Sequence, residues 1–458
     1  MQKACRLITI AEIMNENYRL KKVGADKIVF LLLFVLALLI AQIIITTRSR
    51  LELSEPIELS YAGLSLSIPL GNGWESDKKW YYDENGFSLS SYLFIGAKEP
   101  SAWIFCRYHL APEIVSPEVW FKQKAAEIDG VVEEVNQIQK EKLNIDWARI
   151  ECPDTVLSIF LGTVELPYNH RLDIEINQMT LETGLAQKVF EHVLESFIFR
   201  DNQELNAGGE TVAKIKSRGL DNFLVSRDKQ INFMITNSRK QNIGFALEIL
   251  MDSKSSDDFN IQAASHFYLT GQDNREQGAF YRGKNNIEEF VWQSQTLESA
   301  NDKAYSKTVL DEDGIVTVIK YSNLGMEENR YKFSPTMIPE IFIESLLSQM
   351  LQDDINEIII DIINSDGSII PVYISYTEAD EGIAENSDAI YAFRIDFMSE
   401  QDFSEYVYLD QQKQISRIIL HQNQQYVLEK TSLENIAEAF PERADIILTR
   451  DEKLKSIF

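Results

Sequence analysis

The sequence has few of the residues, and none of the motifs, that usually mark a catalytic or metal site. It contains only three cysteines and five histidines in 458 residues. No Cys-x-x-Cys pair occurs, which argues against a redox motif or a zinc knuckle, and no His-Glu-x-x-His or Gly-x-Ser-x-Gly sequence indicates a hydrolase. These absences predict a protein that is not an enzyme and that needs no cofactor and no metal. An enzyme whose site assembles from scattered residues stays open as an alternative.

Basic residues are also scarce relative to acidic ones. The chain has 44 Lys and Arg against 71 Asp and Glu, which gives a net charge of −27. A protein this acidic repels phosphate backbones, so we expect no nucleic acid among its partners. The part after residue 50 also lacks an Asn-x-Ser/Thr glycosylation site, which favours a bacterial envelope protein over a eukaryotic secreted one.

One long apolar segment is present, over residues 28–45. It reads IVFLLLFVLALLIAQIII and contains no charged residue. As a helix it would extend about 27 Å, close to the hydrocarbon thickness of a bilayer. The segment therefore predicts one transmembrane helix, and it lacks the cleavage site that a secretory signal peptide would need.

Lys and Arg residues near this segment predict its orientation. More of them lie before the segment than after it: Arg19, Lys21, Lys22 and Lys27 before, and Arg48 and Arg50 after. By the positive-inside rule, residues 1–27 form a cytoplasmic tail and the chain is a single-pass signal-anchor protein of the inner (cytoplasmic) membrane. The remaining domains are then periplasmic or otherwise extracytoplasmic.

Residues 57–200 predict a first domain of strands and helices. Residues 57–70 alternate apolar and polar side chains, as a half-buried strand does, and strands rich in aromatics follow. A helix is expected to begin at Ser116-Pro117 and to stop at Gly130, because a hydroxyl can cap the first turn and a proline there needs no partner for its missing N–H. A second helix, with an apolar stripe, is expected over 185–199.

The order of these elements resembles the PsbP-like family, named for the extrinsic protein of photosystem II. The matching features are a strand that leads into a Pro/Gly turn and a Trp, Ser67-Ile68-Pro69 through Gly73-Trp74, and a final helix that ends in Val193-Leu194-Glu195-Ser196-Phe197. The resemblance covers residues 57–200. It implies an antiparallel sheet with packed helices, and non-enzymatic work in assembling or stabilising a larger complex.

The second half of the chain predicts another domain. Residues 201–216 lose apolar periodicity and contain Gly208-Gly209, so they predict a linker. Residues 217–450 contain successive strands with short turns and one or two helices, which favours a large, mostly antiparallel sheet. The expected fold class is therefore α+β throughout. This architecture resembles the envelope carrier fold of LolA- and RseB-like proteins, which implies a curved half-barrel that shelters an acyl chain or a partner peptide.

Two small groups of residues are candidate sites. Cys106 and Cys152 lie in strand-like runs, and they are either a disulfide between adjacent strands or two buried free thiols. Trp80, Tyr81 and Tyr82 cannot all point inward from one strand, so one of them is expected to be exposed and to contact either a partner or the membrane.

The segment from Gly278 to Asn285 nearly matches a P-loop. Asn285 stands where the motif needs a hydroxyl to hold Mg²⁺, and Phe280-Tyr281 is typical of a strand. We therefore interpret the segment as part of a hairpin.

These features predict a membrane-anchored envelope protein with a non-catalytic binding or assembly role and another envelope protein as its partner. The alternative is a carrier or sensor of a lipid or other hydrophobic ligand, held by the second domain.

Overall fold

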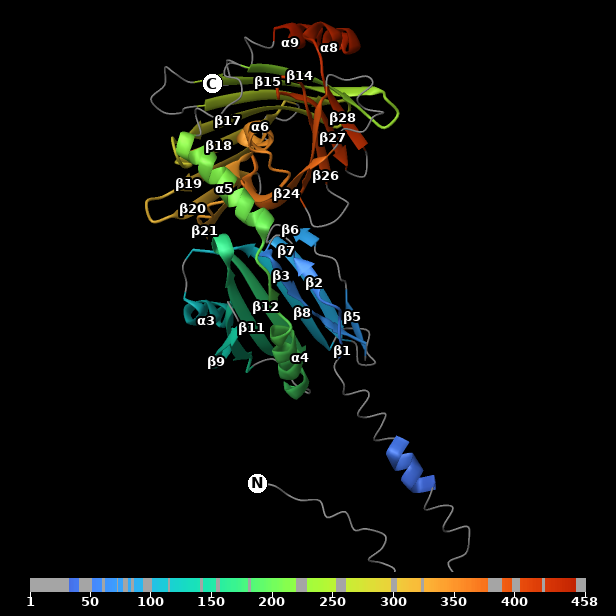
Figure 1. The fold of residues 1–458 in the computed structure, drawn as a ribbon, viewed down its shortest axis with the longest axis vertical. Coiled ribbons are helices and arrows are strands. Elements are labelled where there is room, and N and C mark those ends of the chain that lie inside the picture. Colours follow the sequence, from blue (N-terminus) through green and yellow to red (C-terminus); the bar gives the residue numbers. More distant parts are fainter. Residues whose placement is uncertain are drawn as a thin grey trace, which may run out of the picture. The chain divides into compact units, whose positions relative to one another are not determined.

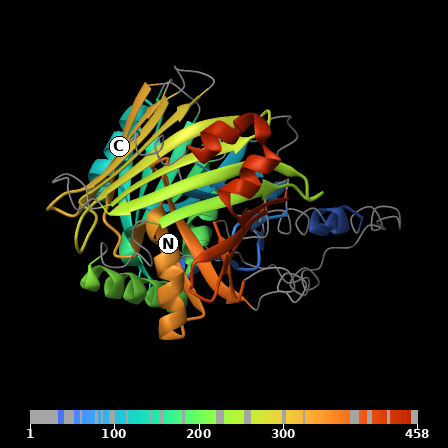
Figure 2. The same ribbon diagram turned by 90° about the horizontal axis from the view of Figure 1, so that it is seen from above.

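The computed structural model divides into two compact units, Met1–Glu52 and Leu53–Phe458, which we describe one at a time (Figures 1 and 2). The residues that the structure describes are 33–40, 52–59, 62–71, 73–76, 81–83, 86–93, 101–113, 116–140, 143–153, 157–179, 183–219, 229–252, 261–297, 303–322, 325–377, 389–397, 404–421 and 425–449.

The first unit contains the apolar segment that predicted a membrane span. Within this segment the structure describes residues 33–40, which are helical. Among the described residues, no helix is both long enough and apolar enough to cross a membrane. The predicted transmembrane helix over 28–45 is therefore wrong, as are the signal-anchor, single-pass and inner-membrane predictions that depended on it. The rest of that segment and the expected tail 1–27 lie outside the described residues.

The second unit is mostly β-structure, which corrects the expected α+β class. Strands make up 55% and helices 24% of the residues that the structure describes. Many strands run for eight residues or more, whereas the helices are few and cover the sheets at only some places. The expectation gave too much weight to the helices because their caps and stripes are the clearest local signals in the sequence.

An eight-stranded antiparallel sheet forms the first half of this unit. In spatial order its strands are β5 (Trp74–Ser76), β7 (Gly86–Leu93), β8 (Ala102–Leu110), β12 (His170–Met179), β11 (Leu157–Leu166), β10 (Leu143–Glu151) and β9 (Val131–Lys140), with β6 (Tyr81–Asp83) also paired to β7. Two small sheets accompany it: β1 (Glu52–Leu53) with β4 (Pro69–Leu70), and β13 (Ile198–Phe199) with β3 (Leu64–Leu66) and β2 (Ile57–Leu59).

Two helices cover opposite faces of the eight-stranded sheet. Phe121 of α3 (Pro117–Glu127) belongs to a core cluster with Ala148 of β10. Phe190 of α4 (Thr183–Glu195) contacts Trp147 of the same strand, with ring centres 5.6 Å apart. Because neighbouring residues of a strand point to opposite faces, α3 and α4 lie on opposite sides of the sheet.

A 15-stranded sheet forms the second half of the unit. Its first and last strands meet in the middle, where β14 pairs with β28, and the remaining strands extend outward from there in two arms. One arm comprises β14 (Lys229–Thr236), β15 (Asn242–Asp252), β16 (Ile261–Leu269), β17 (Asp273–Arg282), β18 (Glu289–Thr296), β19 (Lys303–Leu310), β20 (Ile315–Ser322) and β21 (Gly325–Lys332). The other comprises β28 (Gln425–Lys430), β27 (Ile415–His421), β26 (Ser404–Leu409), β25 (Tyr391–Asp396), β24 (Ile369–Thr377), β23 (Glu357–Ile363) and β22 (Met337–Pro339), of which β22 and β23 are parallel.

The two arms of this sheet approach each other around a helical core. Ser306 of β19 donates a hydrogen bond to the carbonyl of Ser365, in the turn between β23 and β24. Side chains of α5 (Gln203–Arg218) and α6 (Ile343–Asp353) belong to the same hydrophobic core as the facing strands of both arms. Helices α8 (Leu433–Ala439) and α9 (Ala444–Leu448) cover the other face of β15 and β16, as Figure 2 shows. Short 3-10 turns precede α6 and α9, over Glu340–Phe342 and Pro441–Arg443.

The segment predicted as a linker, residues 201–216, is instead most of α5. Asn202 caps the helix by accepting a hydrogen bond from the Leu205 N–H at 3.0 Å. One side of α5 is buried, including Val212 and Ile215, which are fully covered. The linker prediction was wrong because several residues of the buried face are not apolar: Gly208, Gly209, Thr211 and Lys216 belong to it. The face therefore lacks the apolar periodicity by which a buried helix is usually found.

The two glycines that suggested a turn permit close packing of α5. A Cβ on Gly208 would lie 1.9 Å from the carbonyl oxygen of Ile359 in β23, and a Cβ on Gly209 would lie 2.9 Å from the ring of Tyr168. Since glycine has no Cβ, the helix lies directly on β23 at this point.

Candidate functional site

A buried ion pair joins the two large sheets. His170 begins β12 and Asp361 lies in β23; both side chains are 1% exposed, and His170 Nε2 lies 2.9 Å from Asp361 Oδ1. The Thr336 hydroxyl donates a hydrogen bond to the other oxygen of Asp361, and it is also hydrogen-bonded to the buried hydroxyl of Ser334. Removing charges from water is costly, so a pair this deep depends on these additional hydrogen bonds.

Each partner stabilises the charged form of the other. Burial by itself lowers the pKa of His170, but the charge of Asp361 and its hydrogen bond outweigh burial and raise that pKa above the ordinary 6.5. Burial by itself raises the pKa of Asp361, but His170 and the Thr336 and Ser334 hydroxyls outweigh burial and hold that pKa below 3.8. Both groups are therefore charged over the range between these values.

The turn between β11 and β12 holds this ion pair in place. Tyr168 and Asn169 both have positive φ angles, 59° and 60°, which are uncommon for residues with a Cβ. The Tyr168 hydroxyl donates to Asn206 Oδ1 in α5 at 2.8 Å, and Asn169 Nδ2 donates to the Phe333 carbonyl at 2.6 Å. These two hydrogen bonds hold the turn in one conformation, and they offset the energetic cost of its positive φ angles. Three consecutive side chains, at 168–170, thus reach from the first sheet into the second half of the unit.

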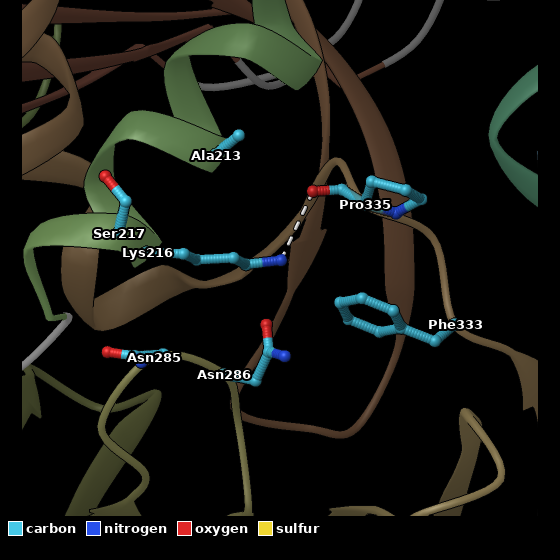
Figure 3. Close-up of a pocket in the computed structure, with 7 residues that line it drawn as sticks. All are labelled: Ala213, Lys216, Ser217, Asn285, Asn286, Phe333 and Pro335. Atoms are coloured by element: carbon cyan, nitrogen blue, oxygen red, sulfur yellow. Dashed lines mark hydrogen bonds between the residues drawn. The ribbon is translucent and has the colours of Figure 1, made fainter.

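A pocket of about 290 Å³ lies beside this junction (Figure 3). Its walls come from α5, from the turn that follows β17 and from the segment that precedes β22. The lining residues are Ala213, Lys216, Ser217, Asn285, Asn286, Phe333 and Pro335. Figure 3 shows the Lys216 side chain extending from α5 toward Pro335, with the Phe333 ring and the Asn286 carboxamide near its amine.

Lys216 is the one charged residue among those that line this pocket. It is 8% exposed, its Nζ donates to the Pro335 carbonyl at 3.2 Å, and that atom lies 4.4 Å from the centre of the Phe333 ring. Burial lowers the pKa of Lys216 to about 7, although the nearby charge of Asp361 opposes this change. At neutral pH the amine is therefore present in both its protonated and its neutral form.

The structure does not bring Cys106 and Cys152 together. Both are buried free thiols. Cys106 lies in β8 and Cys152 follows β10, and β12 and β11 lie between these two strands. Three strand spacings are roughly 14 Å, whereas a disulfide needs Cα atoms within about 7 Å. The disulfide between adjacent strands is thus not formed, and burial raises the pKa of the Cys106 thiol to about 12.

The predicted aromatic contact surface stays a prediction. Trp80 lies outside the described residues. Tyr81 and Tyr82 belong to β6, whose backbone pairs with β7. The structure describes the backbone of these two tyrosines and not their side chains.

Sequence reasoning missed the pocket residues. Lys216 lay in the supposed linker, and Asn285 lay in the rejected P-loop match, which the structure shows to be the end of β17 and the turn after it. One signal in the sequence could have identified Lys216. It directly follows Ile215, which lies with Val212 on the buried face of α5, so its side chain begins at the edge of that face. Among the described residues, no group of three or more His, Cys, Asp or Glu side chains could hold a metal ion.

Comparisons with known proteins add little to this site. No family model matches the chain, and no curated protein matches it. A solved structure described as a beta-barrel-like protein of a domain of unknown function, DUF1849, from Brucella abortus matches 44% of this chain and 95% of its own, with 9% identity and a TM-score of 0.33. None of these comparisons assigns an enzymatic activity, and the resemblances to the PsbP-like and the LolA- and RseB-like proteins stay predictions.

Proposed function

We propose that the protein is a non-catalytic binding protein, a carrier or sensor that holds a small amphiphilic ligand in the pocket beside Lys216. The ligand would have a carboxylate head and a short apolar body. The observation that carries the proposal is the amine of Lys216, which is buried in a pocket and hydrogen-bonded there to a neutral carbonyl.

Charge supports a carboxylate head. Among the residues that the structure describes, the Lys216 amine contacts a neutral carbonyl and no carboxylate. A buried ammonium group in such a setting is costly to desolvate, and an anionic ligand would offset that cost. Asp361 is the carboxylate whose charge raises the pKa of Lys216. It is already paired with His170 and accepts a hydrogen bond from Thr336. The lining contributes no carboxylate of its own.

The remaining lining residues support an apolar body of limited size. Ala213, Phe333 and Pro335 offer apolar surface, and Asn285 and Asn286 offer carboxamides. At about 290 Å³, the pocket is at the lower end of the usual range for ligand sites. The enclosed face of the 15-stranded sheet is occupied by core side chains of α5 and α6, so we place the ligand in this pocket and not across that face.

Hexanoate is expected to bind the protein at pH 6 and to bind the Lys216→Met variant about tenfold more weakly or worse, because a hydrogen bond to a charged group contributes about 1.5–3 kcal/mol. Isothermal titration calorimetry measures both affinities. Binding to the unsubstituted protein should also weaken as the pH rises through about 7, where Lys216 loses its charge.

Lys214→Met is the matched control. Lys214 lies in the same helix, is 51% exposed and pairs with Asp353 at 3.4 Å, so this variant removes the same charge from outside the pocket. It should bind hexanoate as the unsubstituted protein does. Equal binding by the Lys216→Met variant, or no binding by the unsubstituted protein, would contradict the proposal.

A further inference from the structure

We infer that Lys216 holds an aldehyde ligand covalently, as an imine formed in the same pocket. This inference rests on the proposed function, since it concerns the same site, and it adds small straight-chain aldehydes as a ligand class. It would make the pocket a reversible covalent site.

The position of the amine favours attack on a carbonyl group inside the pocket. Lys216 Nζ contacts a neutral oxygen, the Pro335 carbonyl, and lies over the face of the Phe333 ring. Figure 3 shows the amine directed toward the Pro335 carbonyl, with the Asn286 carboxamide near it on another side. A carbonyl compound that enters with its chain along Phe333 would place its carbonyl carbon next to Nζ and its oxygen within reach of Asn286.

The reaction needs only the amine and the aldehyde. The lone pair of Nζ attacks the carbonyl carbon and forms a carbon–nitrogen bond, which gives a carbinolamine. The carbon–oxygen bond then breaks, and the oxygen leaves as water with the two protons that the nitrogen gives up.

Burial supplies the neutral amine that the attack requires. An amine in a desolvated pocket is a better nucleophile at neutral pH than one in water, because less of it is protonated. The lowered pKa of Lys216, about 7, agrees with this requirement.

The test is reductive trapping on the full chain. The protein is incubated with hexanal and sodium cyanoborohydride at pH 7, which converts an imine into a stable hexyl-lysine, and the labelled lysines are identified by peptide mass spectrometry. We expect Lys216 to be labelled about tenfold faster than Lys214, as for lysines activated by desolvation. Exposure alone predicts the opposite order, since Lys214 is 51% and Lys216 only 8% exposed. An excess of hexanoate should slow labelling at Lys216 and leave Lys214 unchanged.

Labelling that follows exposure, with Lys214 modified before Lys216, would overturn the inference. The hexanoate titration separates this failure from a failure of the proposed function. If hexanoate binds and Lys216 is not labelled preferentially, the pocket holds carboxylates without covalent capture. If hexanoate does not bind either, both the pocket function and the inference are wrong.

Discussion

Replacing Asp361 by Asn is expected to lower the free energy of unfolding by about 3 kcal/mol or more, because it removes one partner of a buried ion pair. His170 would lose the charge that holds its proton, and Thr336 would lose its charged acceptor. The contact between His170 and Asp361 joins the two large sheets, so the loss should appear in the global unfolding transition. Urea denaturation followed by circular dichroism measures the change.

The pH dependence of this loss identifies its source. The lowered pKa of Asp361 stabilises the fold above 3.8, and this contribution is lost as the pH falls through the folded-state value. The raised pKa of His170 stabilises the fold fully below 6.5, and this contribution is lost as the pH rises through the folded-state value. The difference between the unsubstituted protein and Asp361→Asn should therefore be largest between about pH 4 and 6.5.

An exposed pair with a similar distance between its charged atoms provides the control. Glu58 lies 2.8 Å from Arg200, and both side chains are more than 60% exposed. Glu58→Gln should change the stability by less than about 1 kcal/mol. An Asp361→Asn protein that is as stable as Glu58→Gln would show that the two sheets are not joined through this pair.

Replacing Gly208 by Ala is expected to destabilise the protein by about 3 kcal/mol. The same change at an exposed helical position would stabilise the protein by about 1 kcal/mol. The sign of the change in the free energy of unfolding therefore shows whether Gly208 is in close contact with β23. Here the new Cβ would lie 1.9 Å from the carbonyl oxygen of Ile359 and 2.8 Å from its carbonyl carbon. These are backbone atoms of a strand that is paired on both sides, by β22 and β24, and they cannot rotate away, so α5 must move off β23. Thermal unfolding and urea denaturation measure the loss.

Two neighbouring substitutions calibrate this result. Gly209→Ala brings its Cβ within 2.9 Å of the Tyr168 ring, which is a side chain and can shift, so we expect a smaller loss. Glu210→Ala changes an exposed residue and should stay within about 0.5 kcal/mol of the unsubstituted protein. A Gly208→Ala protein of unchanged or increased stability would mean that α5 does not pack on β23.

Local signals in the sequence gave correct predictions where a feature depends on neighbouring residues. Ser116 caps α3 and Pro117 begins it, as the hydroxyl and proline indicated. The second predicted helix, expected over 185–199, is α4 at Thr183–Glu195. It ends earlier than predicted, and Ile198–Phe199 form the strand β13. Alternating segments after residue 228 form strands of one sheet, because side chains that alternate along a chain match the two faces of a strand.

Features that join distant segments could not be predicted in this way. His170 and Asp361 are 191 positions apart, and β14 pairs with β28 across nearly the whole second half of the chain. The pocket combines three separate segments, 213–217, 285–286 and 333–335. A single sequence shows which residues can be buried, but it does not show which distant residues meet.

Two predictions failed because one local pattern fits more than one structure. Gly208-Gly209 is typical of a turn, yet glycine also occurs where a helix approaches another backbone closely. The apolar segment 28–45 was interpreted by hydropathy and length alone, and the described residues contain no helix that could cross a membrane.

The pKa of Lys216 should be measured by NMR of protein labelled with ¹³C at the lysine ε-carbon, with the resonance assigned by comparison with Lys216→Arg. The proposed site requires an amine that is buried beside Phe333 and Pro335. We expect a titration midpoint of about 7, which hexanoate should raise because a bound carboxylate favours the protonated amine. A midpoint near the ordinary lysine value of 10.5, unchanged by hexanoate, would place the amine in water and would contradict a ligand site at Lys216.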